Sequence, residues 1–401
     1  VTGGSLTFSS GATVLSVGPL SLTGGELRFD SGELIQPTSL TLSGGTLRGT
    51  DNITVQSGGA MTFSGGTMNG SSTTTTSNAG ITLSGGTKDL INGRILVIAG
   101  PATWSGGDIE LFSSSQFQLQ SGKTFTDSGT GNRFIVGGSG TFANAGTYAK
   151  TSTGTTDIQS TFNNTGTADV QAATLKLTGG GTTSGTATFN VNTGATLQFN
   201  SNYSLIGFSD ITGAGAVTIS SGTTLQVSGS AVTTIAPQLT NAGTVDLQTG
   251  TLSLTGGGSN TGTLNVASPN TLEIGGGTFD LQTGSSLTGS GVVAVNAGTL
   301  TKSGTGTLAF APELVVNGGT LNVTTGTLNL TNGGSSTSTL TIGSGATLEI
   351  SADSFDFLGG TSVTGGGTLK VSGGTLVASA SGTVTVAPTL TQTGGTVTLI
   401  G

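Results

Sequence analysis

The sequence predicts an all-β protein that folds as a single right-handed parallel β-helix, in which each coil of about 20 residues stacks on the one before it. Three observations support this prediction. A two-glycine turn returns at a nearly fixed interval, apolar residues keep fixed offsets from that turn, and apolar and polar residues alternate between turns. Together they indicate short strands that close into coils.

The turn occurs as TGGSL, TGGEL, SGGTL, SGGTM, SGGTK and SGGDI, and it returns once in every coil. Glycine suits such a turn because it adopts positive φ angles at little cost. The predicted rung turns are centred on the second glycine of each pair: Gly4, Gly25, Gly45, Gly66, Gly86 and Gly107.

The second observation is a column of large apolar residues three places before these glycines. We expect its side chains to form one continuous core ladder, because a fixed offset from a repeating turn places them on the same inward face. The residues of this ladder are Leu22, Leu42, Phe63, Leu83 and Trp104.

The third observation is the alternation within one coil, which is clearest between Gly25 and Gly45. ELRF, ELIQ and SLTL are three period-two runs separated by DSG, by a corner containing proline, and by SGG. Three strands and three turns therefore make one coil, and successive coils are expected to stack in parallel at roughly 4.8 Å.

The predicted organisation is one continuous β-helix over residues 1–401. Residues 1–111 hold regular rungs, 112–161 less regular ones, and 162–401 three 76-residue blocks plus the start of a fourth. Each block is expected to hold about four rungs. Its length follows from equivalent glycines at nearly equal spacing, which are Gly166, Gly243, Gly319 and Gly395.

Two segments interrupt the regular rungs. The polar run Ser71–Ser77 predicts a bulged corner, where one rung lacks its apolar strand. The apolar stretch Leu90–Phe112 contains Arg94 and Trp104, and it predicts a rung with larger core residues. The alternative for that stretch is a contact patch where an apolar loop leaves the coil.

Composition restricts the function. Charged residues make up 7% of the chain, 10 basic against 18 acidic, so nucleic acid is not an expected partner. The sequence has no His and no Cys, which excludes thiol chemistry and most transition-metal sites. We therefore expect no cofactor and no metal site. No run of eighteen apolar residues occurs, so no membrane-spanning helix is expected, and low charge with abundant Gly, Ser and Thr favours a secreted, extracellular or cell-surface location.

The repeats GGTLNV, TGTLNL, GATLEI and GGTLKV, together with INGRILVIAGPATWSGG, resemble the passenger regions of autotransporters and other large secreted bacterial adhesins of the haemagglutinin type. The resemblance covers nearly the whole chain and lies in the pattern of the repeats. It implies a β-helix exported to the cell surface, whereas the signal sequence and the translocator or secretion domain of that family do not occur in this sequence.

Carbohydrate-active β-helices use carboxylates gathered on adjacent rungs, because glycosidic cleavage needs an acid and a base. The nearest candidates are the pairs Asp353 with Asp356, and Asp108 with Glu110. The second pair flanks Ile109, so alternation points both side chains outward. Other acids recur with the block, as Glu273 and Glu349 do, which favours solvated surface residues. We therefore expect no catalytic residue and no enzyme activity.

The function favoured by these observations is an extracellular structural or adhesive rod, a segment or subunit of a surface fibre, surface layer or long adhesin. The alternatives are a polysaccharide lyase or hydrolase, and a flat ligand-binding face such as an ice-binding surface. Charge interrupts the column that such a face would need, which reads Ser5, Glu26, Thr46, Thr67, Thr87 and Asp108.

The ends of the chain suggest one partner. The sequence begins directly on a rung turn and finishes within the first rung of a block, so both terminal rungs are expected to present unpaired backbone groups. Self-association end to end, or stacking on neighbouring repeats of a longer chain, would pair them. The residues expected at this contact are Val1, Leu6, Leu399 and Ile400. Cell-surface or glycan contact is a further expectation.

Overall fold

The computed structural model describes residues 1–14, 17–75, 78–379 and 382–400. Within this part of the chain every regular element is a β-strand, and the strands stack in parallel as a β-solenoid of about 18 turns with rungs of about 21 residues. The fold class predicted from the sequence, an all-β parallel solenoid, is thereby confirmed. The chain divides into two compact units, Val1–Ser201 and Asn202–Gly401, which are described in turn.

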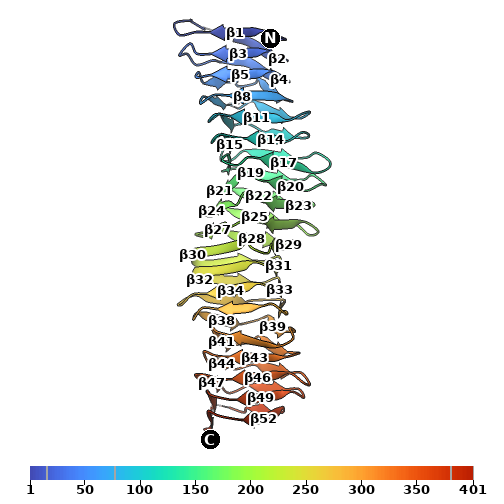
Figure 1. The fold of residues 1–401 in the computed structure, drawn as a ribbon, viewed down its shortest axis with the longest axis vertical. Coiled ribbons are helices and arrows are strands. Elements are labelled where there is room, and N and C mark those ends of the chain that lie inside the picture. Colours follow the sequence, from blue (N-terminus) through green and yellow to red (C-terminus); the bar gives the residue numbers. More distant parts are fainter. Residues whose placement is uncertain (15–16, 76–77, 380–381, 401) are drawn as a thin grey trace. The chain divides into compact units, whose positions relative to one another are not determined.

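In the first unit each complete coil contributes one strand to each of three parallel ladders, which we call 1a, 1b and 1c (Figure 1). Ladder 1a contains β1 (Ser5–Phe8), β3 (Glu26–Phe29), β5 (Thr46–Gly49), β8 (Gly66–Asn69), β11 (Lys88–Ile91), β14 (Ile109–Leu111), β17 (Arg133–Val136), β20 (Thr156–Ile158), β23 (Thr174–Leu177) and β26 (Thr196–Phe199).

Ladder 1b contains β2 (Val17–Leu22), β4 (Pro37–Leu42), β7 (Ala60–Phe63), β10 (Gly80–Leu83), β13 (Ala102–Trp104), β16 (Thr124–Asp127), β19 (Thr147–Lys150), β22 (Thr167–Val170) and β25 (Thr188–Val191). Ladder 1c contains β6 (Ile53–Thr54), β9 (Thr73–Thr75), β12 (Ile95–Ile98), β15 (Gln116–Leu119), β18 (Thr141–Asn144), β21 (Thr161–Asn164) and β24 (Gly181–Thr183).

The second unit has the same three-strand coil, with ladders 2a, 2b and 2c. Ladder 2a contains β29 (Ala216–Ile219), β31 (Gln238–Asn241), β33 (Gly258–Asn260), β36 (Thr278–Leu281), β39 (Thr299–Lys302), β42 (Thr320–Val323), β45 (Thr339–Ile342), β48 (Ser362–Thr364) and β51 (Thr385–Val386). Two long strands, β30 (Thr224–Ile235) and β32 (Thr244–Leu254), turn a corner and supply first ladder 2c and then ladder 2b.

The rest of ladder 2b is β28 (Asp210–Gly213), β35 (Thr271–Ile274), β38 (Val292–Val295), β41 (Glu313–Val316), β44 (Gly334–Ser336), β47 (Ser354–Phe357), β50 (Thr375–Ala378) and β53 (Thr396–Leu399). The rest of ladder 2c is β27 (Tyr203–Ile206), β34 (Thr263–Val266), β37 (Ser286–Thr288), β40 (Thr307–Phe310), β43 (Thr327–Leu330), β46 (Thr347–Ile350), β49 (Thr368–Val371) and β52 (Thr389–Gln392).

The interior is built from the inward side chains of all three strands. Alternation sets which residues point inward, so most four-residue strands have their second and fourth residues buried. In the middle of the first unit the inward positions carry aromatic rings. Phe142 has ring centroids at 5.2 Å from Phe117, 5.4 Å from Tyr148 and 5.1 Å from Phe162. These rings fill the core with edge-to-face contacts.

Residues 112–140 lose the regular interval because one rung is longer. The chain from Ile109 to its partner Ile135 is longer than the chain from Leu27 to its partner Leu47, which spans a regular rung. The extra residues lie in the corner between Leu119 and Phe125 and in the loop between Asp127 and Arg133. The buried side chains of Asp127 and Arg133 approach to 3.0 Å. The insertion leaves the coil and returns to it without breaking the ladders.

The polar run at Ser71–Ser77 is not a bulged corner as far as the structure describes it, and that prediction is wrong. Residues 73–75 form β9, and Ser72 and Thr74 are buried at inward positions. The Ser72 hydroxyl donates a hydrogen bond to the Gly49 carbonyl, whereas the buried Thr74 hydroxyl has no hydrogen-bond partner. Residues 76 and 77 lie outside the described part.

The 76-residue block and the coil have different periods. The block from Leu239 to Glu313 spans eleven strand segments, or three and two-thirds coils at three segments per coil. Equivalent residues therefore fall on different ladders. Leu239 lies on 2a, Leu314 on 2b and Leu390 on 2c. Each copy of the block is rotated by a third of a turn about the axis of this unit.

Identical sequences consequently occupy different faces. TLEI forms β35 on ladder 2b and β46 on ladder 2c, with the same burial pattern in both. Ladders 2b and 2c of the second unit are thus equivalent environments for this strand.

Candidate functional site

The five residues of the predicted core ladder stack in consecutive coils of ladder 1b. Leu22 pairs with Leu42, Leu42 with Phe63, Phe63 with Leu83, and Leu83 with Trp104. Each is at most 1% exposed. They are structural residues with no access to a ligand.

Five of the six predicted turn glycines have positive φ, which are Gly4, Gly25, Gly45, Gly66 and Gly107. At Gly45 a Cβ atom would lie 2.5 Å from the Gly25 carbonyl oxygen, so any side chain there would collide with the coil below. Gly86 departs from the pattern, because Gly85 takes the positive φ instead.

Lys88 in this rung points into the core, and it pairs with Gly66. Lys88 is 0% exposed, and its ammonium donates hydrogen bonds to the carbonyls of Ser84, Gly86 and Gly106 at 3.1, 2.7 and 2.6 Å. The apolar column of ladder 1a continues beside it through Leu90, which pairs with Met68. Lys150 and Lys302 also bind turn carbonyls in this way.

Arg94 is buried too but has no such acceptors. It is 0% exposed, and none of its three guanidinium nitrogens has a hydrogen-bond partner. Burial lowers its pKa to about 10. The apolar stretch around it forms core strands, with Leu90, Ile98 and Trp104 buried, while Phe112 is 38% exposed.

The acid pairs considered for catalysis do not form a paired acid and base. Asp353 is exposed and lies just before β47, while Asp356 accepts a hydrogen bond from the Ser354 hydroxyl. Asp108 and Glu110 flank the buried Ile109 and lie half-buried on the outer face of ladder 1a. The Asp108 carboxylate accepts the backbone N–H of Phe134 at 2.9 Å, which makes it a structural acceptor.

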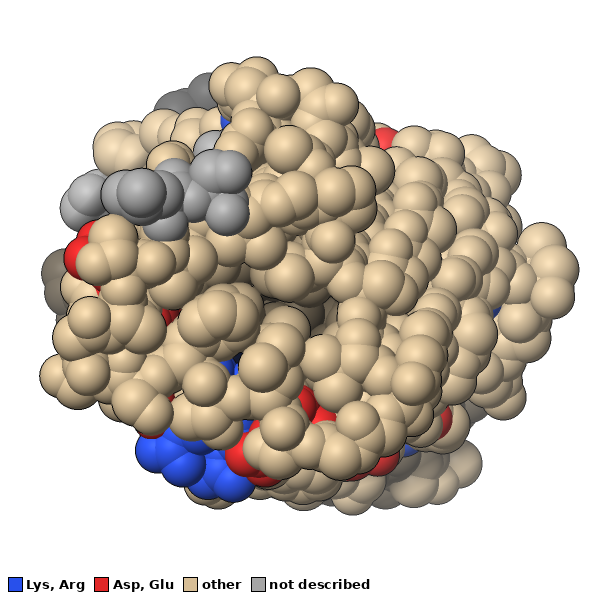
Figure 2. Space-filling model, turned by 90° about the horizontal axis from the view of Figure 1, so that it is seen from above, with Lys and Arg blue, Asp and Glu red and all other residues tan. Residues whose placement is uncertain are grey.

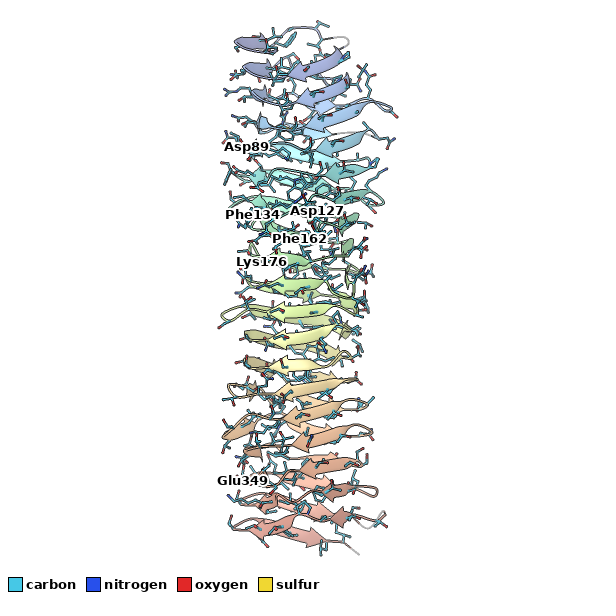
Figure 3. The ribbon with its side chains drawn as sticks, turned by 90° about the vertical axis from the view of Figure 1, so that its right-hand side faces the viewer. Asp89, Asp127, Phe134, Phe162, Lys176 and Glu349 are labelled. Atoms are coloured by element: carbon cyan, nitrogen blue, oxygen red, sulfur yellow. The ribbon has the colours of Figure 1, made fainter. Side chains whose placement is uncertain are left out.

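The recurring acids do not share a face. Asp280 lies on ladder 2a and Asp356 on 2b, while Glu273 lies on 2b and Glu349 on 2c. Figure 3 shows Glu349 at the outer edge of its coil, where it pairs with Lys370 at 2.9 Å. Rotation of the block therefore distributes these charges around the second unit.

The residues expected at end-to-end contacts are largely accessible. Leu6 is 45% exposed, Leu399 79% and Ile400 52%, and the amino group of Val1 donates to the Ser21 carbonyl. The proposed flat column also differs from its expected sequence. After Thr67 it continues through Asp89 and Glu110, not Thr87 and Asp108, so charge interrupts it again.

The outer face of ladder 1a carries a groove lined by polar side chains and one aromatic ring, which we call the 1a groove. It has a volume of about 390 Å³ and is lined by Asn132, Phe134, Thr155, Asp157, Thr174, Lys176, Gln198 and Asn200. Its floor is one column of paired residues on β17, β20, β23 and β26, namely Phe134, Asp157, Lys176 and Gln198. Figure 3 shows Phe134 and Lys176 along one edge of the unit, with Asp127 and Phe162 further inside.

Asp157 is held firmly within this column. Its carboxylate lies 3.4 Å from the Lys176 ammonium and accepts hydrogen bonds from Thr178 at 2.6 Å and Gln159 at 3.3 Å. It is 6% exposed and is the only carboxylate among the residues that line this groove. Glycosidic cleavage uses two carboxylates, so this arrangement favours binding over catalysis.

A negative region adjoins the groove. Asp89 and Glu110 are paired neighbours on ladder 1a, and Asp108 lies beside Glu110 in sequence. Burial together with the charges of Asp89 and Asp108 raises the pKa of Glu110. Elsewhere charge is sparse, and most of the surface in Figure 2 is neither acidic nor basic.

Sequence analysis did not identify the 1a groove. Phe134, Asp157, Lys176 and Gln198 follow one another at unequal intervals, so no constant spacing aligns them. Of these strands TLKL alternates in the sequence, with Leu175 and Leu177 on either side of Lys176, whereas RFIV and TDI do not. The alternation predicts that Lys176 points outward without predicting which residues lie beside it.

No family model matches the chain, and no curated protein or solved structure is significantly similar to it. Among the described residues no cluster of three or more acidic, His or Cys side chains is arranged to hold a metal ion. The same residues include no helix long and apolar enough to cross a membrane.

Proposed function

We propose that this chain is an extracellular structural and adhesive solenoid, a segment or subunit of a surface fibre, surface layer or long adhesin of the autotransporter passenger or haemagglutinin type. The observation that carries the proposal is the use of almost every side chain for stacking. Inward residues fill the core, and many outward ones hydrogen-bond to the next coil, as Thr67 does to Asp89.

The low charge and the abundant Gly, Ser and Thr support an extracellular location. Every coil is hydrogen-bonded to its neighbours within each unit, so stiffness comes from the backbone and needs no disulfide. Such a scaffold holds surface groups in fixed positions, which suits adhesion.

The direct test is attachment of the purified chain to cell surfaces and polysaccharide-coated surfaces, with fractionation of the native cells to locate it. We expect saturable attachment and recovery in the surface or secreted fraction. Recovery only in the cytosol, or no attachment to any surface, would contradict the proposal.

We further propose that the chain is not a hydrolase or lyase. The test is incubation with acidic and neutral polysaccharides. Release of oligosaccharides that is lost when Asp353, Asp356 or Asp157 is changed to Asn would reverse this conclusion.

End-to-end association is the mode of self-assembly that we propose for the rod. Val386, Leu390, Leu399 and Ile400 are all exposed near one end of the second unit, a set of apolar groups that stacking would bury. Sedimentation across a concentration series should show growing oligomers, and Leu399→Asp with Ile400→Asp should abolish them. A rod that stays monomeric at high concentration would refute this contact.

A further inference from the structure

We propose that the 1a groove binds an uncharged oligosaccharide lying along the stacking direction, with one sugar ring against Phe134. This inference rests on the proposed adhesive function and names its ligand class. It starts from the one aromatic residue that lines the groove, in a column that otherwise presents Asp157, Lys176 and Gln198.

The chemistry of the lining matches that of a sugar. A pyranose has an apolar C–H face and a rim of hydroxyls, each of which both donates and accepts hydrogen bonds. Phe134 is half-buried, so its backbone is fixed while part of the ring faces the groove. Asn132, Gln198 and Asn200 carry side-chain amides, which also donate and accept.

The lining is preorganised. The side-chain oxygen of Asn132 accepts the Thr155 backbone N–H at 2.9 Å, which orients its NH₂ group as a remaining donor. Asp157 is fixed by Lys176, Thr178 and Gln159, and Phe134 is fixed through its own N–H by Asp108. Binding therefore requires little ordering of the protein, which favours affinity for a weakly interacting ligand.

The length of the column favours an oligomer. The column crosses four coils, and three steps of roughly 4.8 Å place Phe134 and Gln198 on the order of 14 Å apart. That span exceeds a single sugar ring, so successive rings would contact successive coils.

The charges of the region favour a neutral ligand. The charges of the one ion pair in the groove cancel, since Asp157 and Lys176 face each other. The adjacent carboxylates Asp89, Asp108 and Glu110 make the surroundings negative, so a polyuronate would be repelled.

The experiment is calorimetric titration of the whole chain with neutral oligosaccharides of two to six units and with polygalacturonate at the same sugar concentration. We expect affinity for at least one neutral series that rises with length, and no binding of polygalacturonate. Phe134→Ala should weaken binding about tenfold or more, and Asn200→Ala should weaken it less. Phe208→Ala is the matched control, because Phe208 is 57% exposed and lies outside the groove.

Thermal melts of each variant show whether it is folded, and Phe134→Leu keeps the apolar bulk if Phe134→Ala does not fold. Absence of binding by every neutral series, binding unchanged in the folded Phe134 variants, or tighter binding of polygalacturonate would overturn the inference. Surface attachment that survives in Phe134→Ala would leave the adhesive function standing and refute the groove as its site. Oligosaccharide binding without surface attachment would refute the adhesive function alone.

Discussion

Two buried cations, Lys88 in β11 and Arg94 just before β12, are predicted to affect stability in opposite directions. Arg94→Met should stabilise the fold, because the guanidinium is buried with no hydrogen-bond partner. Replacing a buried ion by a hydrophobic residue of similar shape stabilises proteins by about 1–4 kcal/mol, and the lack of partners in this structure favours the upper half of that range.

Lys88→Met is the matched variant, with the same replacement at an equally buried cation. It removes three hydrogen bonds to carbonyl oxygens, each worth roughly 1.5–3 kcal/mol because the donor is charged. The substitution also removes the free-energy cost of burying the ammonium, which offsets part of this loss. We expect Lys88→Met to destabilise the fold by about 2–4 kcal/mol.

The assay is urea unfolding followed by the fluorescence of Trp104, the only tryptophan of the chain. Trp104 is buried in the strand that follows the one adjoining Arg94, so its signal reports the unfolding of these coils even if distant coils unfold separately. A higher midpoint for Arg94→Met and a lower one for Lys88→Met are expected. A loss of stability in Arg94→Met would refute the reasoning, since it would mean that the guanidinium makes favourable contacts.

Burial lowers the pKa of Lys88 and of Lys150 from 10.5 to about 8. Between pH 8 and 10 the unfolded chain therefore binds more protons than the folded chain, and stability should rise with pH. Melting temperatures that stay constant in this range, or a rise that persists in the Lys88→Met, Lys150→Met double variant, would contradict this prediction. Phe63→Asp should lower the free energy of unfolding by several kcal/mol, because a lone carboxylate would replace a fully buried ring, and Phe63→Leu should lower it less. Equal melting temperatures of the two variants and the unchanged chain would show that Phe63 is not in the core. Deleting residues 239–313, one block, should leave a continuous solenoid in which the coils that follow turn to another face, whereas deleting 239–307 should break the stacking and make those coils sensitive to limited proteolysis.

The solenoid and its core columns follow from the sequence because one physical constraint is repeated many times. A narrow core admits only inward apolar residues at fixed intervals, and Leu22, Leu42 and Phe63 therefore reveal their stacking without a structure. The number of strands per coil can be predicted from the rung between Gly25 and Gly45, where three alternating runs are separated by turns.

The remaining features depend on register, which the repeats do not encode. The positive φ moves from Gly86 to Gly85 and Lys88 pairs with Gly66 where the regular interval would pair it with Met68, and extra residues before Arg133 lengthen one rung. The rotation of the blocks also could not be predicted from the sequence, since TLEI has the same burial pattern on ladders 2b and 2c. The 1a groove lies beyond these irregular rungs, so its members could not be aligned in advance.

The account depends on the register across the long rung, because that register places Phe134, the aromatic residue of the 1a groove, beside Asp108 and the neighbouring acidic residues. Its direct test is oxidation of the Glu110→Cys, Val136→Cys variant, in a chain that has no other cysteine. These residues pair on the outer face of ladder 1a, so a disulfide should form readily. The control, Glu110→Cys with Phe134→Cys, places the thiols out of register along the strand and should stay reduced. A disulfide in the control and none in the first variant would show that the long rung follows another path and that Phe134 does not lie beside the acidic residues of ladder 1a.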